Sequence, residues 1–397
     1  MIEVLQLPIQ QARHFYLITD LTQDPKNSYF CIAIFGGVMQ NNIFDLYTDY
    51  LISSFSQTSA TGLSHTLGGE ISHDKITRML SKDLFTQKNL WQMVKKTIRQ
   101  IETSEGVLII DDSIEEKPHT DENDIICWHF DHCQNRSVKG INFLTTLYYN
   151  DGYSIPVTYQ IVSKTKLVID EKTGKEKRKS PKSKNEHFRE MISTSKQNEI
   201  KFKYVISDVW YSSSENMMFI KKNIKREFVM PLKSNRKIAL TKSDKLMGKY
   251  QEVSSLQIEQ NTVKEIYLEG VDFPMILIKQ VFTNGDGSTG ILYLISSDLT
   301  IDYTQVTTIY KKRWKVEEYH KSLKQNASLE KSPTKTVVTQ SNHFFASLIA
   351  FYKLEIITKE AKLNHFALKT KIYMKAIVVA FKELQNLKSK VKEFSCA

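Results

Sequence analysis

Two apolar runs end in aspartates, at places where carboxylates could bind metal ions together. Residues 107–110 lead directly into Asp111 and Asp112. Residues 204–206 lead, through one serine, into Asp208. This pattern is typical of a strand that is buried on both faces and ends at a polar edge. Neighbouring strand ends lie along a common edge of an α/β sheet. Carboxylates there suit Mg²⁺ or Mn²⁺, and two such ions can activate an attacking oxygen and stabilise a leaving one.

A third carboxylate is predicted on a helix over residues 302–325. At about 100° per residue, Glu317 falls on the same face as Arg313, whereas Glu318 falls well away from it, so the geometry selects Glu317. The alternative interpretation is a solvated face with an ion pair between Arg313 and Glu317, four residues apart. Four residues share the selected face: Tyr310, Arg313, Glu317 and Lys324.

The elements that must position these residues indicate an α/β fold with a β-rich insertion and helical ends. Two strands, 141–149 and 155–162, flank a hairpin turn, and the Lys-rich segment 164–184 is predicted to be a mobile loop. Five regions are expected: a helical N-terminal DNA-binding region (1–104), a first catalytic-core segment (105–222), a β-rich insertion (223–299), a second catalytic-core segment with the Glu317 helix (300–336), and a helical C-terminal region for DNA contact or dimerisation (337–397).

The N-terminal region contains a candidate helix-turn-helix. Residues 59–67 and 72–80 have helical patterns, and the pair Gly68-Gly69 separates them. Ser72 is a suitable N-cap for the second helix, and two short helices around a glycine turn are typical of this motif. An ordinary helical hairpin is the alternative. Four residues of the second helix are candidates to contact DNA: His73, Lys75, Thr77 and Arg78.

The composition favours an intracellular protein that binds nucleic acid. The 397 residues include 55 Lys+Arg against 44 Asp+Glu, a formal net charge of +11, and this surplus favours nucleic acid before a membrane surface. Four cysteines without regular spacing indicate a reducing cytosol. The N-terminus lacks the pattern of a signal peptide, and the longest apolar stretch, 29–39, is about half of what spans a bilayer. We therefore expect a cytoplasmic protein without a membrane segment, with 29–39 in the core.

The segment between Cys127 and Cys133 includes His129 and His132 and could suggest a zinc site. The spacing is too tight for a zinc knuckle and lacks a paired Cys-x-x-Cys. Residues 125–130 alternate in polarity like a strand, so a strand or loop near the active site is the preferred interpretation.

The shared face of the predicted helix resembles a known signature. Tyr310, Arg313, Glu317 and Lys324 match the Y-R-E-K signature of a large family of bacterial insertion-sequence transposases, insertion-sequence family four. The segment 110–113 resembles the first motif of this family, in which the catalytic Asp precedes Ser or Thr. The segment 206–211 resembles the second. The resemblance covers roughly residues 105–330.

This resemblance implies a ribonuclease-H-like fold, a mixed sheet flanked by helices, and a site residue for each motif. Mg²⁺, with Mn²⁺ as a substitute, would be bound by Asp112, Asp208 and Glu317, the catalytic triad. Asp111 is the competing first ligand. Adjacent residues of a strand point to opposite faces, so only one of the two aspartates can serve, and the serine after Asp112 favours Asp112. The remaining signature residues would hold DNA phosphates near the cut, as their chemistry suggests: Tyr310, Arg313 and Lys324.

The resemblance also implies a DNA transposase that cuts and pastes. Such an enzyme binds terminal inverted repeats, frees a 3′-OH by strand cleavage and directs it at target DNA. Two ends are cut together, so a homodimer on paired ends is expected, associated with the bacterial nucleoid. Two alternatives are a nuclease of the same fold that does not join strands, and an inactive or repurposed transposase that regulates transcription as a DNA-binding protein.

The sequence departs from the family in one respect. Relatives can use a tryptophan of the β-rich insertion to stack on a flipped base beside the cut, but none of the four tryptophans lies in 223–299. Base flipping needs an aromatic or apolar platform. Four aromatic residues of the insertion could substitute: Tyr250, Tyr267, Phe273 and Phe282.

Overall fold

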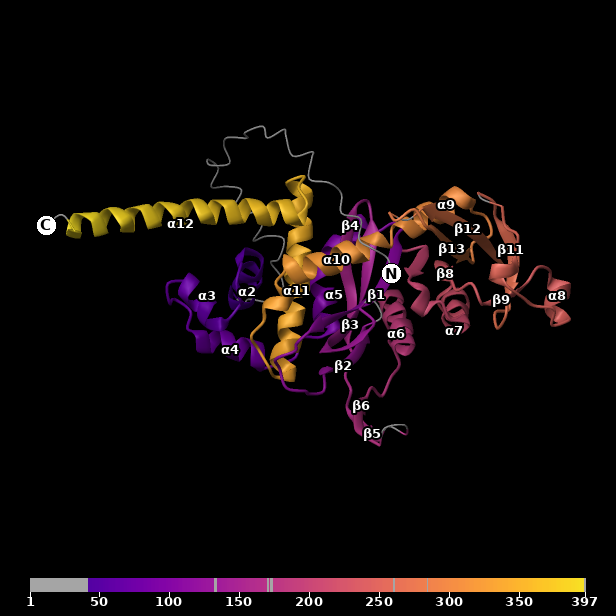
Figure 1. Cartoon of the computed structure of the whole chain (residues 1–397), viewed down its shortest axis with the longest axis horizontal. Helices are drawn as coiled ribbons and strands as arrows, with labels where there is room; N and C mark the ends of the chain where they lie inside the picture. Colours follow the sequence, from indigo (N-terminus) through magenta and orange to yellow (C-terminus); the bar gives the residue numbers. More distant parts are fainter. Residues whose placement is uncertain are drawn as a thin grey trace.

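The computed structural model describes residues 42–131, 134–169, 171, 174–259, 261–283 and 285–395. The expected core segment 29–39, the rest of the first 41 residues and Cys133 lie outside these residues, so the structure bears on none of them. The described residues form a large mixed sheet with helices on its faces (Figure 1).

Strand β1, Val107–Glu116, is an interior strand of the sheet, between β7 and β3. It runs parallel to β7, Tyr204–Ser207, and antiparallel to β3, Arg136–Asn150. Two further strands, β2 (Ile126–Asp131) and β4 (Tyr153–Ile161), pair with β3. The described residues thus confirm the mixed α/β sheet, and β2 covers the segment that alternated like a strand.

The turn between β3 and β4 has the predicted hairpin chemistry. Asp151 and Gly152 have φ values of 48° and 77°, the left-handed region that a two-residue hairpin turn of this kind requires. Aspartate tolerates this region better than most residues and glycine occupies it freely. The turn fixes the register that places β4 beside β3.

The strands of the predicted insertion lengthen the same sheet. Strand β8, Glu227–Leu232, is parallel to β7, and β13, Thr289–Ser296, pairs antiparallel with β8. The sheet therefore continues without interruption from the first aspartate strand into the insertion. The remaining strands follow outward: β12 (Met275–Thr283), β11 (Lys264–Leu268), β9 (Lys237–Ala239) and β10 (Gln251–Glu252).

The N-terminal helices match the predicted helical pattern. Helix α3, Ala60–Thr66, and helix α4, His73–Ser81, are joined through two glycines of positive φ, and the Ser72 hydroxyl caps α4. The long helix α11, Val337–Glu360, is largely buried and contacts several of these helices and β4. The other helices of the N-terminal and C-terminal regions are α2 (Asn42–Ser53), α5 (Gln87–Ile101) and α12 (His365–Ser395).

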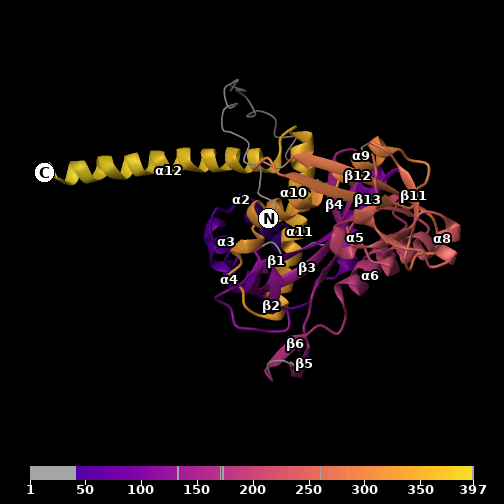
Figure 2. The same ribbon diagram turned by 45° about the vertical axis from the view of Figure 1, so that its right-hand side comes forward.

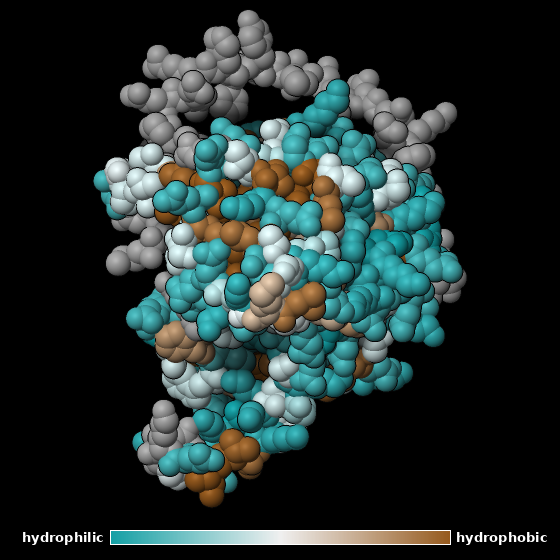
Figure 3. Space-filling model, turned by 90° about the vertical axis from the view of Figure 1, so that its right-hand side faces the viewer, coloured by the Kyte–Doolittle hydropathy of each residue, from teal (hydrophilic) through white to brown (hydrophobic). Residues whose placement is uncertain are grey.

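The Lys-rich segment forms a hairpin rather than the predicted loop. Strand β5, Lys166–Ile169, pairs with β6, Glu176–Lys179, and an ion pair of 2.9 Å between Arg178 and Asp124 fastens the hairpin to the core. Two short extended segments that lie antiparallel can form such a pair through their backbone hydrogen bonds. Its end projects below the molecule in Figure 1 and shows apolar surface at the bottom of Figure 3. Two of its side chains are largely exposed, Leu167 at 59% and Ile169 at 71%.

The single helix expected over 302–325 is two helices. Helix α9, Tyr303–Lys311, and helix α10, Trp314–Gln325, meet at a tight turn. The amides of Lys312 and Arg313 donate to carbonyls three residues earlier rather than four, which is the tighter 3₁₀ pattern. The turn changes how the residues before it are placed relative to Glu317, so the single-helix prediction was wrong at this point.

Shorter helices complete the connections between these elements. Helix α6, Lys184–Gln197, begins with a capping box between Ser183 and Glu186 and contacts β3 and β4. The rest are α7 (Ser214–Met218), α8 (Lys242–Leu246), and the short turns η1 (Val209–Tyr211), η2 (Phe219–Ile224), η3 (Val253–Ser255) and η4 (Leu329–Lys331). Among the described residues, no helix is both long enough and apolar enough to cross a membrane.

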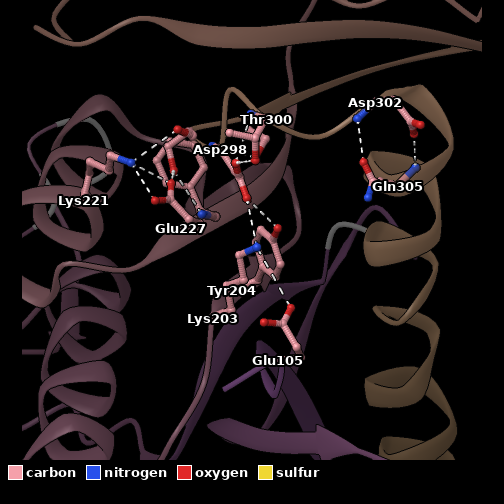
Figure 4. Close-up of polar contacts among 12 residues, drawn as sticks. Glu105, Lys203, Tyr204, Lys221, Glu227, Asp298, Thr300, Asp302 and Gln305 are labelled. Atoms are coloured by element: carbon pink, nitrogen blue, oxygen red, sulfur yellow. Dashed lines mark hydrogen bonds and ion pairs between the residues drawn. The ribbon is translucent and has the colours of Figure 1, made fainter. Parts of the chain in front are cut away.

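A buried polar network ties the end of β13 to the start of β7, just before α9 (Figure 4). The Tyr204 hydroxyl donates to Asp298 Oδ2 at 2.7 Å, and Lys203 Nζ lies 3.3 Å from the same carboxylate. Burial alone would raise the pKa of Asp298, but hydrogen bonds from Thr300 and Tyr204 lower it to about 2. The network holds the chain that leads into the helix pair carrying Glu317.

Replacing Asp298 by Asn is expected to lower the free energy of unfolding at neutral pH by about 1–3 kcal/mol, because it leaves buried donors without a charged acceptor. The pKa of Asp298 is depressed in the folded state, so its contribution is present above the unfolded pKa of about 4 and is lost as the pH falls toward 2. Denaturant unfolding at several pH values should show the difference shrinking in acid. Asp286→Asn, in the exposed turn after β12, is the control and should change stability by less than about 0.5 kcal/mol.

Candidate active site

Strand β1 places its two aspartates on opposite faces of the sheet. Asp111 is paired in register with Thr145 of β3, and the hydroxyl of Tyr319, on α10, donates to Thr145 Oγ1 at 3.3 Å. Asp111 therefore faces α10. Asp112 faces the other side, where α6 covers the sheet and Lys184 lies at its first position.

Asp112 is enclosed by hydrogen-bond donors. Its carboxylate accepts from Lys184 Nζ at 2.6 Å, from the Tyr211 hydroxyl at 2.6 Å and from Asn142 Nδ2 at 3.0 Å. Burial alone would raise the pKa of Asp112, but the Lys184 ammonium and these hydrogen bonds outweigh it and hold the pKa below its usual value. Three strong donors leave this carboxylate little capacity to bind a cation.

Asp111 lies instead among other carboxylates. The last register pair of β1 and β7 is Ile110 with Ser207, and Asp208 continues in extended conformation, so Asp111 and Asp208 lie side by side on one face. Burial raises the pKa of Asp111 well above its usual value, and the charges of Asp208, Asp112 and Glu317 raise it further. Burial and the charge of Asp112 also raise the pKa of Asp208.

Glu317 reaches this group from the first turn of α10. Its side chain is 47% exposed, and its Oε1 atom lies 2.9 Å from Arg313 Nη1. The same guanidinium nitrogen lies 3.9 Å from Asp111 Oδ2. The ion pair between Arg313 and Glu317 is thus present, but Arg313 also faces Asp111, so this face of α10 covers an acidic site and is not an ordinary solvated surface.

The other signature residues lie in two places, beside the carboxylates and at the backbone of β1. Tyr310 is largely buried, burial raises its pKa to about 12, and its ring centroid lies 6.0 Å from Arg313 Cζ. Lys324 is two turns beyond Glu317, and its Nζ atom donates to the carbonyl oxygen of Ile114 at 2.8 Å. Tyr310 and Arg313 therefore flank the carboxylates, whereas Lys324 is bound to the backbone of β1.

His320 belongs to the site although the sequence analysis gave it no role. One ligand atom each from Asp111, Glu317 and His320 lies within 4.8 Å of the others. The imidazole is 7% exposed, and burial, assisted by the charge of Lys324, lowers its pKa to about 3. The spacing Glu317-x-x-His320 on a helix was the available signal, because residues three apart share a face.

Replacing Asp111 by Asn and replacing Asp112 by Asn are expected to have opposite effects on the stability of the metal-free protein. Asp111→Asn should raise the free energy of unfolding at neutral pH by on the order of 1 kcal/mol, because it removes a buried charge beside other carboxylates. Asp112→Asn should lower it by about 1–3 kcal/mol, because it leaves Lys184 without its partner.

The pKa of Asp111 is raised in the folded state, so its contribution to stability is greatest in acid and is lost as the pH rises. The advantage of Asp111→Asn over the wild type should therefore grow as the pH rises above the unfolded pKa of about 4. Thermal unfolding in EDTA would measure both variants. A stabilising Asp112→Asn, or a destabilising Asp111→Asn, would contradict this view of the two faces.

The residues present fit a divalent cation. Asp111 on β1, Asp208 directly after β7 and Glu317 on α10 lie on one face of the sheet, and burial, together with repulsion from the neighbouring carboxylates, raises the pKa of Asp111 well above its usual value. A cation among them would relieve that repulsion, and carboxylate oxygens are the ligands that Mg²⁺ and Mn²⁺ prefer.

The aromatic candidates of the insertion differ in exposure. Phe282, on β12, is exposed, and it packs over Gly290 of the neighbouring strand. Tyr250, Tyr267 and Phe273 are partly buried. If a residue of the insertion stacks on a base, Phe282 is therefore the most accessible of the four.

A mixed sheet with acidic residues side by side on two neighbouring strands, beneath a helix that adds a further carboxylate, defines a metal-dependent enzyme that cleaves or transfers polynucleotide strands. A family model described as DDE superfamily endonuclease matches residues 38–249, and one described as transposase DDE domain matches residues 159–352. The first match covers more than half of the chain, which belongs to the DDE superfamily of endonucleases. Its substrate is DNA, and its catalysis requires divalent metal ions. No curated protein sequence matches the chain significantly.

Proposed function

We propose that the protein is the DNA transposase of an insertion sequence, which binds terminal inverted repeats, cleaves strands at the transposon ends and joins them to target DNA. The observation that carries the proposal is that Asp111 lies beside Asp208 on one face of the sheet and close to Glu317. The Y-R-E-K signature supports membership of insertion-sequence family four, since Tyr310 and Arg313 flank these carboxylates.

Asp111, rather than Asp112, is the first metal ligand in this proposal. Asp111 shares a face with Asp208 and Glu317, whereas Asp112 is held by Lys184 and Tyr211 on the other face. Bound Mg²⁺ or Mn²⁺ would supply activation of the attacking oxygen and stabilisation of the leaving oxygen. Asp112 would act as a positioning residue, because it anchors Tyr211 in the turn directly after Asp208.

The remaining residues orient DNA around the site. Arg313 presents a planar fork of donors beside the carboxylates and is suited to a phosphate of the cleaved strand. Tyr310 lies beside Arg313, while Lys324, on α10, would contribute charge from its position at the backbone of β1. Helix α4 would contact the inverted repeat through side chains that are all exposed: His73, Lys75, Thr77 and Arg78.

The protein is proposed to act as a homodimer that pairs two transposon ends, with α12 as the contact between the copies. Helix α12 extends away from the rest of the described structure in Figures 1 and 2, and it exposes large apolar side chains between Tyr373 and Leu387. Apolar residues recur along it at alternating spacings of four and three, the heptad pattern of a coiled coil: Tyr373, Ile377, Ala380, Leu384 and Leu387.

Charge complementarity supports a second copy as the occupant of this stripe. Glu383 and Lys388 flank the stripe and are five residues apart. In a parallel two-stranded coiled coil, charges at these g and e positions meet across the two helices. Each Glu383 would therefore face Lys388 of the other copy.

The function is tested by incubating the full-length protein with duplex DNA that carries the inverted repeats flanking its gene, with and without Mg²⁺. We expect a nick that leaves a 3′-OH at the repeat end, and transfer of pre-cut ends into plasmid DNA. Cleavage without joining would favour the nuclease alternative, and repeat binding without cleavage would favour the DNA-binding regulator. Absence of both binding and cleavage would overturn the proposal.

A further inference from the structure

A buried histidine with an unpaired ring nitrogen borders the carboxylate site. His320 is on α10, one turn after Glu317, and is packed between Phe143 and Tyr319. Its Nε2 atom is buried, and no described residue provides it with a hydrogen-bond partner. A buried polar atom without a partner costs about 1–3 kcal/mol, so a residue of this kind calls for an explanation.

The geometry makes a metal ion a suitable partner. One ring nitrogen of His320 and one carboxylate oxygen from each of Asp111 and Glu317 lie within 4.8 Å of one another. The aromatic neighbours Phe143 and Tyr319 hold the ring in place. A neutral imidazole has one nitrogen lone pair available for coordination.

We propose that His320 is a direct ligand of one divalent ion, which it shares with Asp111 and Glu317. The inference rests on the proposed metal site and adds a nitrogen ligand to it. Imidazole nitrogen binds first-row transition-metal ions, whereas Mg²⁺ prefers oxygen ligands. This position therefore favours Mn²⁺ over Mg²⁺, and the enzyme has one metal position that differs from an all-carboxylate site.

The test is pulsed electron paramagnetic resonance of Mn²⁺ added to the full-length protein without a polyhistidine tag. Coordinated imidazole produces ¹⁴N modulation in the spin echo, and labelling the histidines with ¹⁵N should change it. The wild-type spectrum alone decides the central point. Bound Mn²⁺ without nitrogen modulation overturns the role of His320 and leaves the carboxylate site intact.

Variants test whether His320, and not another histidine, provides the nitrogen ligand. His320→Gln should remove the nitrogen modulation, weaken Mn²⁺ binding by about tenfold or more, and make the remaining Mn²⁺ easier to displace with Mg²⁺. His129→Gln is the matched control, because His129 is also buried, its Nε2 has no hydrogen-bond partner among the described residues, and it lies outside the cluster. It should retain the modulation. Modulation that persists in folded His320→Gln would overturn the inference.

Binding of Mn²⁺ to the carboxylate variants distinguishes the two proposals. Asp111→Asn and Glu317→Gln should each weaken Mn²⁺ binding, as measured from the free Mn²⁺ signal. If wild-type protein bound no Mn²⁺, or if these two variants bound it unchanged, the proposed metal site itself would be wrong and the role of His320 would fall with it.

Discussion

Replacing Asp111 by Asn is expected to abolish metal-dependent cleavage of DNA, with a loss of at least about a thousandfold in rate. The side chain lies on the face shared with Asp208 and Glu317, and an amide offers a neutral oxygen where the site needs a charged ligand. Glu317→Gln should have a similar effect. Nicking of repeat-bearing duplex DNA in Mg²⁺ measures both losses, and binding of the same DNA without metal should be retained.

Asp112→Asn is the matched control for Asp111→Asn, since it changes the adjacent residue in the same way. It should destabilise the protein, yet Mn²⁺ should still bind, because Asp112 is occupied by Lys184, Tyr211 and Asn142. Loss of metal binding in Asp112→Asn, together with retained metal binding in Asp111→Asn, would reverse the assignment and restore Asp112 as the ligand.

Features that depend on local sequence could be predicted well. An apolar run that leads into an acidic residue located both aspartate positions. The strand does end before Asp208, but β1 continues past Asp111 and Asp112 to Glu116, so the expected strand end at the first pair was wrong. The hairpin at Asp151 and Gly152 was predictable because its backbone conformation depends on those two residues. Glu317 was selected over Glu318 by helical periodicity alone.

Features that depend on contacts between distant segments could not be derived in this way. Which aspartate faces Glu317 depends on the register of β1 against β7 and on the side of the sheet that α10 covers. The serine after Asp112 indicates neither the register of β1 nor the side of the sheet that α10 covers. The sequence pattern also could not show that β8 would pair with β7, which joins the insertion to the central sheet.

The helix break at Arg313 and the burial of His320 could not be predicted from the sequence pattern either. The turn at Lys312 and Arg313 is a change from four-residue to three-residue hydrogen bonding, which leaves the residue pattern helical. His320 is one turn after Glu317 on α10, but it is buried against Phe143, which belongs to a strand about 180 residues earlier in the chain. Its isolation from hydrogen-bond partners is therefore visible only in the folded chain.

Leu384→Glu is expected to convert a dimeric protein into a monomer at micromolar concentration. The substitution would place a carboxylate in the apolar stripe of α12 in both copies, at an expected loss of about 4–6 kcal/mol, or about a thousandfold or more in dissociation constant. Sedimentation velocity across a concentration series measures it. Asn386→Glu adds the same charge to an exposed position outside the stripe and should leave the dimer intact.

Exchange of charges tests whether the two helices are parallel. Glu383→Lys and Lys388→Glu should each weaken the dimer, because each places like charges opposite one another, and the double variant should restore it. Cleavage of paired ends should be lost in Leu384→Glu, while binding to a single end is retained, since α4 and the carboxylate site lie elsewhere in the chain. A monomeric wild-type protein, or a dimer that survives Leu384→Glu, would show that α12 has another partner.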